Sequence, residues 1–185
     1  MKLARSVVSL RLQGVSRIAP LDPERLIRVL NKHKVEFVLI GALAARLHGF
    51  PRLTADADIT PASDRPNVKR LAAALRELDA KVYTESIPEG LDFDCSAATL
   101  ERARMWNLVT NAGRVDVAFF PSGTEGFEDL AKGAERFEAF GVKFLASSLD
   151  DIIRSKEAAG RPKDRSDVVL LKELKRRTNR TRRGR

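Results

Sequence analysis

Two patterns of apolar positions alternate along the chain. Apolar residues at helical spacing, as after the capping Asp22 and the following Pro23, predict helices. Short apolar or alternating runs such as VEFVLI predict strands. The predicted helices cover residues 22–34, 42–49, 66–78, 127–134, 148–159 and 164–174. The helix that ends at residue 159 is capped by Ser147 or Ser148. The predicted strands cover residues 35–40, 54–60, 106–110 and 114–120, with a further hairpin over residues 137–146. The pattern therefore predicts an α+β fold in one domain, residues 20–174.

Composition is that of an ordinary globular protein, with 43% hydrophobic and 32% charged residues among 185. The single cysteine, Cys95, excludes an internal disulfide and a cysteine-rich zinc site, and it fits a reducing cytoplasm. No apolar run approaches the roughly 18 residues that a membrane helix needs. Arg11 interrupts the apolar N-terminal stretch, which is therefore not typical of a signal peptide. We expect a cytoplasmic protein without a membrane partner.

The net charge of +9 is concentrated at the two ends. Residues 172–185 contain eight basic residues and one acid, and residues 1–17 contain four basic residues and no acid. We expect residues 1–19 to be a basic extension and residues 175–185 a disordered basic tail. Such a tail either binds a polyanion such as RNA or only solubilises the protein. The candidate RNA-binding residues are Lys175, Arg176, Arg177, Arg180, Arg182 and Arg183.

Three carboxylates stand out in the predicted strands. Asp56 and Asp58 alternate in TADADIT and therefore share one strand face. Asp116 lies in the apolar strand RVDVAFF, where a buried carboxylate needs a partner. If the two strands are neighbours, the three carboxylates converge and suit Mg²⁺, with two ions for phosphoryl displacement. The alternatives are a surface turn for Asp56 and Asp58, and an arginine such as Arg114 as the partner of Asp116.

Two blocks of sequence stand out, VLIGALAARLHGFPRLTADADI (residues 38–59) and SLDDIIRSKEAAGRPKDRSDVVLLKEL (residues 148–174). They resemble the AbiEii-like branch of the polymerase-β-type nucleotidyltransferases. This branch includes the mycobacterial MenT-type toxins of toxin–antitoxin pairs. The resemblance spans residues 35–174 and implies a short mixed sheet flanked by helices, with helices at the C-terminus. Ala42 departs from the Ser or second Gly of many members, which removes one hydroxyl from the phosphate site.

The resemblance implies a role for each matching residue around the nucleotide. Gly41 and Ala42 would face the triphosphate, and Asp56 and Asp58 would bind the metal ions. Asp116 would complete the metal site and orient or deprotonate the attacking hydroxyl.

The second block supplies the other implied residues. Lys156 and Arg161 would contact phosphate, and Asp167 would lie at the nucleotide or acceptor side of the cleft. The alternative for Lys156 is a solvated helix face. Asp164 is interpreted as a cap of the last helix.

Arg52 and Thr54 flank the carboxylates and are assigned to nucleotide binding. Arg52 would offset the negative charge or contact phosphate. Thr54 is also a candidate regulatory phosphosite, because a phosphate there would place negative charge against the metal and triphosphate site. A Thr54→Glu variant with full activity would argue against that hypothesis.

The implied function is a Mg²⁺-dependent toxin that transfers a nucleotide from a nucleoside triphosphate (NTP) to the 3′ end of tRNA. Pyrophosphate would leave, translation would stop, and a cognate antitoxin would restrain the enzyme. One alternative keeps the chemistry but changes the acceptor to an aminoglycoside-like molecule or a protein side chain. The last alternative is a non-catalytic binding module, which the presence of all three carboxylates and Lys156 disfavours.

Overall fold

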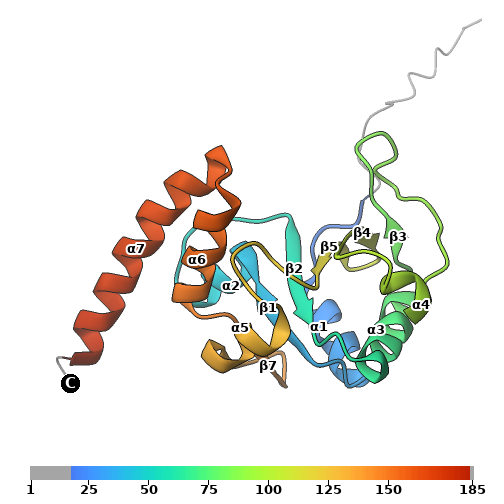
Figure 1. Ribbon diagram of the computed structural model, residues 1–185, viewed down its shortest axis with the longest axis horizontal. Helices are drawn as coiled ribbons and strands as arrows, with labels where there is room; N and C mark the ends of the chain where they lie inside the picture. Colours follow the sequence, from blue (N-terminus) through green and yellow to red (C-terminus); the bar gives the residue numbers. More distant parts are fainter. Residues whose placement is uncertain (1–17, 184–185) are drawn as a thin grey trace, which may run out of the picture.

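A seven-stranded sheet in the order β3-β4-β5-β2-β1-β7-β6 forms the centre of the computed structural model, which describes residues 18–183 (Figure 1). The strands are β1 (Phe37–Ile40), β2 (Asp56–Pro61), β3 (Lys81–Val82), β4 (Met105–Thr110), β5 (Gly113–Ala118), β6 (Glu135–Ala139) and β7 (Val142–Ala146). The helices are α1 (Pro23–Lys32), α2 (Gly41–Leu47), α3 (Arg65–Glu77), α4 (Ala97–Leu100), α5 (Phe127–Gly133), α6 (Leu149–Ala159) and α7 (Pro162–Arg183). This α+β arrangement confirms the predicted fold class.

The pairing of the central strands positions the candidate site. β2 runs antiparallel to β1, with Asp58 opposite Ile40, and parallel to β5, with Asp58 opposite Asp116. β7 is parallel to β1 on its other side. The C-terminal ends of β1 and β7 therefore lie next to the beginning of β2 and the middle of β5.

Helix caps follow the sequence pattern closely. The side chain of Asp22 accepts a hydrogen bond from the backbone N–H of Arg25 at 3.0 Å, which fixes the start of α1. Ser148, rather than Ser147, caps α6 in the same way through the N–H of Asp151 at 3.1 Å. Gly160 ends α6 with a φ of +62°, a conformation that favours glycine.

The hydrophobic core joins the helices to the sheet. Apolar side chains with less than 2% exposure come from both, since α1 and α3 present one apolar face and β1, β2 and β4 present theirs. These residues include Leu26, Leu30, Leu39, Ile59, Leu71, Leu75 and Leu108. Among the described residues, no helix has both the length and the apolar character needed to cross a membrane.

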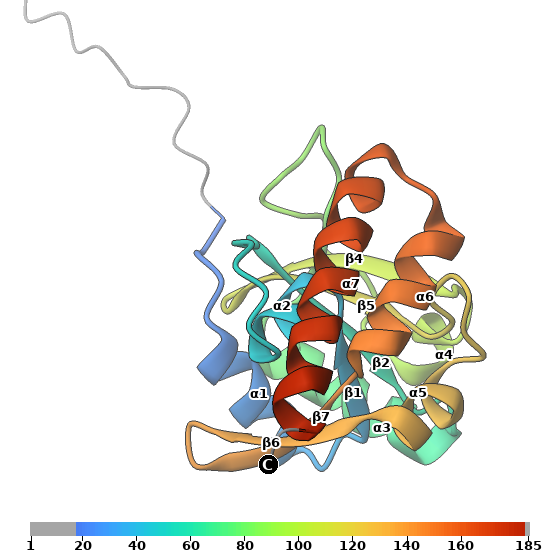
Figure 2. The ribbon, with the colours of Figure 1, turned by 90° about the vertical axis from the view of Figure 1, so that its left-hand side faces the viewer.

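Helices α6 and α7 pack side by side at one end of the molecule, while α3 and α4 lie at the other (Figures 1 and 2). The sequence predicts that the last helix ends near Leu174, and this is wrong. Helix α7 continues to Arg183, so the prediction of a disordered tail is wrong for residues 175–183. No proline or glycine interrupts this stretch, and arginine and lysine favour helices. An ion pair between Glu173 and Arg177 at 3.0 Å supports the extension.

The other predicted elements are confirmed to within a few residues, including both hairpins. The short strand β3 and the single turn of α4 were not predicted, because two and four residues carry too little pattern. The expected basic extension 1–19 lies mostly outside the described residues.

Candidate active site

The turn between β1 and α2 forms one wall of a cleft. Gly41 begins α2 directly after Ile40, with a φ of +67°. A Cβ placed on Gly41 would lie 2.1 Å from Oδ2 of Asp58. Only glycine therefore allows the backbone to turn here and to approach this carboxylate. Ile40 gives α2 no side-chain cap, so the first amides of the helix depend on partners from outside it.

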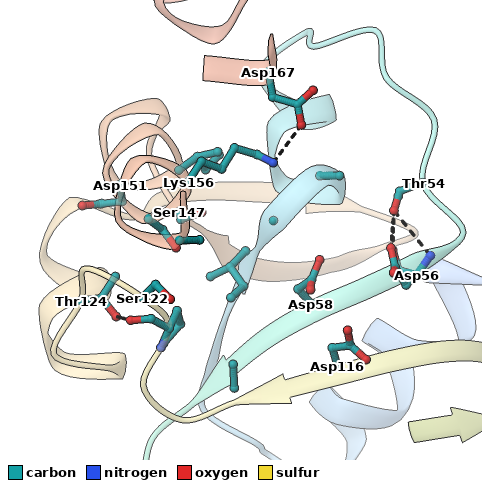
Figure 3. Close-up of a pocket in the computed structure, with 18 of the residues that line it drawn as sticks. Thr54, Asp56, Asp58, Asp116, Ser122, Thr124, Ser147, Asp151, Lys156 and Asp167 are labelled. Atoms are coloured by element: carbon teal, nitrogen blue, oxygen red, sulfur yellow. Dashed lines mark hydrogen bonds and ion pairs between the residues drawn. The ribbon is translucent and has the colours of Figure 1, made fainter. Parts of the chain in front are cut away.

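The carboxylates of β2 and β5 form the floor of the cleft. Figure 3 shows Asp58 and Asp116 on neighbouring strands, with Asp56 beside Thr54. Burial, followed by the nearby charges of Asp56 and Asp116, raises the pKa of Asp58 from 3.8 to about 7. Burial and then Asp56 also raise the pKa of Asp116 above its ordinary value. A bound cation would therefore stabilise the ionised forms of Asp58 and Asp116.

The donor set fits a hard divalent cation. Oδ1 of Asp116 is buried and has no hydrogen-bond partner among the described residues. Mg²⁺ prefers carboxylate oxygens as ligands, and this site offers three carboxylates, one of which has an oxygen without a hydrogen-bond partner among the described residues. However, within residues 18–183 no group of three potential ligands is already arranged around one position. One reason is that the hydroxyl of Thr54 holds the carboxylate of Asp56. An ion bound by Asp56 would replace this contact with Thr54.

A buried ion-pair network closes the opposite wall. Nζ of Lys156 on α6 lies 2.8 Å from Oδ1 of Asp164 and 2.9 Å from Oδ2 of Asp167, both on α7. Asp167 also pairs with Arg52 from the segment after α2, and Nε of Arg161 lies 2.6 Å from Oδ2 of Asp164. Burial would raise the pKa of Asp164 and Asp167, but the hydrogen bonds from Lys156 and the arginines lower both. The network therefore joins α6, α7 and the α2–β2 segment.

This network shows that two interpretations of the sequence are wrong. Lys156 has only 13% of its side chain exposed, so a solvated helix face is wrong. Asp164 lies inside the first turn of α7 and is fully buried in the network, so its interpretation as a cap is also wrong. The predicted contact of Lys156 with phosphate remains a prediction.

One cleft of about 570 Å³ brings together all ten residues that the sequence assigned to catalysis, metal or nucleotide. They are Gly41, Ala42, Arg52, Thr54, Asp56, Asp58, Asp116, Lys156, Arg161 and Asp167. The candidate RNA-binding residues lie elsewhere, on the extension of α7. Lys175 pairs there with Asp150, and Arg176 and Arg177 pair with Glu173. Arg176, Arg177 and Arg180 are exposed to solvent. The side chains of Arg182 and Arg183 lie outside the described residues.

Sequence reasoning missed several residues of the cleft. Ser147 follows β7, is 1% exposed, and has an Oγ without a hydrogen-bond partner among the described residues. Its position directly after the predicted hairpin was the only signal, and the sequence offered it only as a helix cap. Phe120 also lines the cleft and is 43% exposed, although the sequence places it in an apolar strand.

The raised pKa of Asp58 makes stability depend on pH when no metal is present. The native state keeps this proton up to about pH 7, whereas the unfolded chain releases it near 3.8. The protonated carboxyl therefore contributes its full stability below pH 3.8, and this contribution is lost as the pH rises through 7. Asn mimics the neutral form, so Asp58→Asn should be more stable than wild type at pH 8, by up to about 4 kcal/mol.

Thermal or urea unfolding in a chelating buffer at pH 4 and pH 8 measures this effect. The difference between variant and wild type should nearly vanish at pH 4. The matched control is Asp92→Asn, because Asp92 is 89% exposed and lies outside the cleft. An Asp58→Asn difference that is equal at both pH values would contradict the assignment.

Comparison with known proteins identifies the fold of the chain. No protein-family model and no curated protein sequence matches the chain. Among solved structures, the chain is similar to the lincosamide antibiotic adenylyltransferase LnuA with bound lincomycin. The TM-score is 0.55 at 15% identity, over 84% of this chain and 99% of LnuA. It is also similar to the antibiotic-resistance factor ANT(2″)-Ia, with a TM-score of 0.50 at 16% identity, over 86% of this chain and 90% of that one. The chain therefore has the nucleotidyltransferase fold.

Proposed function

We propose that the protein is a metal-dependent nucleotidyltransferase that uses an NTP. The observation that carries this proposal is the convergence of three carboxylates, the Gly41 turn and Lys156 in one cleft. Phosphoryl transfer depends mainly on positioning of the reactants and on neutralisation of their charge. Each of these groups would contribute to one of these two effects. The nucleotidyltransferase fold supports the proposal.

The roles of the residues follow from their places. The backbone at Gly41 and Ala42 contacts the triphosphate, and Lys156 and Arg161 offset its charge. Mg²⁺, held by Asp56, Asp58 and Asp116, would neutralise the phosphates and polarise the α-phosphorus.

Asp116 orients the acceptor hydroxyl and takes its proton as the oxygen attacks. The new bond joins that oxygen to the α-phosphorus, the bond from this phosphorus to the bridging oxygen breaks, and pyrophosphate leaves. Asp167 acts through its pairing, since it fixes Lys156 and Arg52 at the cleft wall.

We propose that the acceptor is the 3′ end of tRNA, with loss of translation as the result. The support is the basic face of α7 together with the resemblance to toxins. Arg176, Arg177 and Arg180 are exposed on that helix, so phosphate groups of a bound RNA can contact them. A toxin of this kind requires a cognate antitoxin, which belongs to the same proposal.

A small hydroxylated acceptor is the second candidate. The observation that favours it is the fold shared with LnuA and ANT(2″)-Ia, whose descriptions name antibiotics. The test incubates the protein and Mg²⁺ with each α-labelled NTP and, separately, total tRNA, an aminoglycoside or a lincosamide. Label on tRNA supports the first candidate, and label on the antibiotic supports the second. NTP binding without transfer to any of the three would overturn both.

Removal of the three exposed arginines tests the role of α7. The combined variant Arg176→Ala, Arg177→Ala and Arg180→Ala should raise the KM for tRNA about tenfold at physiological salt and should reduce the salt dependence of binding. The KM for the NTP should not change. The control removes the same charge elsewhere, through alanine at Arg28, Arg65 and Lys69. Equal effects in both variants would contradict an RNA contact on α7.

A further inference from the structure

Exposed apolar side chains gather at the mouth of the cleft. Seven large hydrophobic residues are exposed within the described part of the chain, and three of them line the cleft. These are Leu53, Met105 and Phe120, which are 80%, 51% and 43% exposed. Apolar groups left in water at the edge of a charged cleft are typical of a ligand-binding surface.

Phe120 lies on the same wall as Asp116. Residues of a strand point to alternate sides, so Asp116 and Ala118 of β5 face the cleft. Phe120 lies two residues beyond the end of β5 and lines the same cleft. Phe119 faces the core instead, with 5% exposure, and its N–H donates to the carbonyl of Arg104 at 2.9 Å. A ligand group on this ring therefore lies in the same cleft as Asp116.

The guanidinium of Arg104 lies over one face of the Phe120 ring. Its distance from the ring centroid is 4.9 Å, and both residues line the cleft. Met105 follows Arg104 at the same rim. Nucleobases stack on phenylalanine rings and on guanidinium planes, and the arginine charge also attracts RNA phosphate.

The order of the strands separates β5 from the Gly41 turn. This turn follows β1, whereas Phe120 follows β5, and β2 with its carboxylates lies between these two strands. Asp116 and the Gly41 turn are therefore on opposite sides of β2, and Phe120 lines the same cleft as both.

We propose that Phe120, with Arg104 and Met105 beside it, is the subsite on which a terminal nucleobase of the RNA acceptor stacks. This inference rests on the proposed function, and it identifies the acceptor as a single-stranded RNA end. Stacking holds the terminal nucleotide so that its hydroxyl reaches Asp116. The base of the incoming NTP is the other source of a planar ring, and the Kd of the NTP for Phe120→Ala distinguishes the two sources.

The test measures transfer from an α-labelled NTP to tRNA and to the same tRNA with an abasic 3′-terminal nucleotide. Phe120→Ala should raise the KM for intact tRNA about tenfold and should leave the Kd of the NTP unchanged. Phe120→Trp should retain the wild-type KM, because indole also stacks. The abasic tRNA should be a poor acceptor for wild type, with no further loss in Phe120→Ala.

Phe140→Ala is the matched control, because Phe140 is 41% exposed and lies on the β6–β7 turn outside the cleft. An unchanged KM for tRNA in Phe120→Ala would overturn the stacking site while leaving the proposed function intact. A raised Kd for the NTP in that variant would overturn it in favour of the nucleotide base. Absence of any transfer to tRNA by the wild-type protein would overturn the proposed tRNA acceptor itself, and the stacking site with it.

Discussion

Replacement of Asp58 by Asn should abolish nucleotidyl transfer while leaving the protein folded. Asp58 faces the Gly41 turn on one side and Asp116 on the other, so it lies between the proposed triphosphate and acceptor sites. Asn keeps the shape but removes the charge that a divalent cation needs. We expect kcat to fall at least about a thousandfold, as when several kcal/mol of transition-state stabilisation are lost.

The measurement is single-turnover transfer at saturating Mg²⁺, with unfolding measured on the same sample. Wild-type kcat is expected for Asp92→Asn, which removes an exposed carboxylate elsewhere. The combination of lost activity and undiminished stability is the decisive feature, because a merely structural role would lower stability. Activity within tenfold of wild type would show that Asp58 is not in the metal site.

Loss of the Lys156 charge should destabilise the protein more than loss of any exposed lysine. Lys156 is paired with Asp164 and Asp167, whose side chains are 1% and 7% exposed. The substitution Lys156→Met removes the positive charge that pairs with these two buried carboxylates. Breaking such a pair costs about 3–5 kcal/mol, whereas an exposed pair contributes about 1 kcal/mol or less.

Urea unfolding of Lys156→Met and Lys172→Met makes the comparison. Lys172 also joins α7 to α6, through Glu157 at 2.6 Å, but half of its side chain is exposed. The pKa of Asp164 and of Asp167 is lowered in the native state, so their contribution to stability is present above pH 3.8 and is lost as the pH falls below it. The cost of Lys156→Met should therefore shrink towards pH 3. Equal stability of the two variants at pH 7 would refute the buried network.

Much of the candidate site was predictable because its residues sit in strong local patterns. Asp56 and Asp58 alternate on a strand, and Asp116 interrupts an apolar strand, so each signal is contained within a few residues. The Gly41 turn follows a short buried strand, and a single glycine marks it. The structure adds the parallel pairing of β2 with β5, which brings Asp58 opposite Asp116.

The remaining features depend on contacts that local patterns do not contain. Arg52 and Asp167 form a pair across 115 positions of sequence. Phe120 has the apolar character of its strand, and only the end of β5 at Ala118 and the buried Phe119 turn it towards the cleft. Helix α7 extends beyond its predicted end. The amphipathic pattern stops near Leu174, but the residues that follow still have a high helix propensity.

The central claim is transfer of a nucleotide, and the position of the label in the NTP tests it most directly. The wild-type protein is incubated with Mg²⁺ and, separately, total tRNA, an aminoglycoside or a lincosamide, with the same NTP carrying label at either the α- or the γ-phosphorus. The account predicts that α-label enters the acceptor, tRNA first of all, and that γ-label is released as pyrophosphate. Entry of γ-label into the acceptor would show a kinase, and absence of both labels from every acceptor would contradict a transferase.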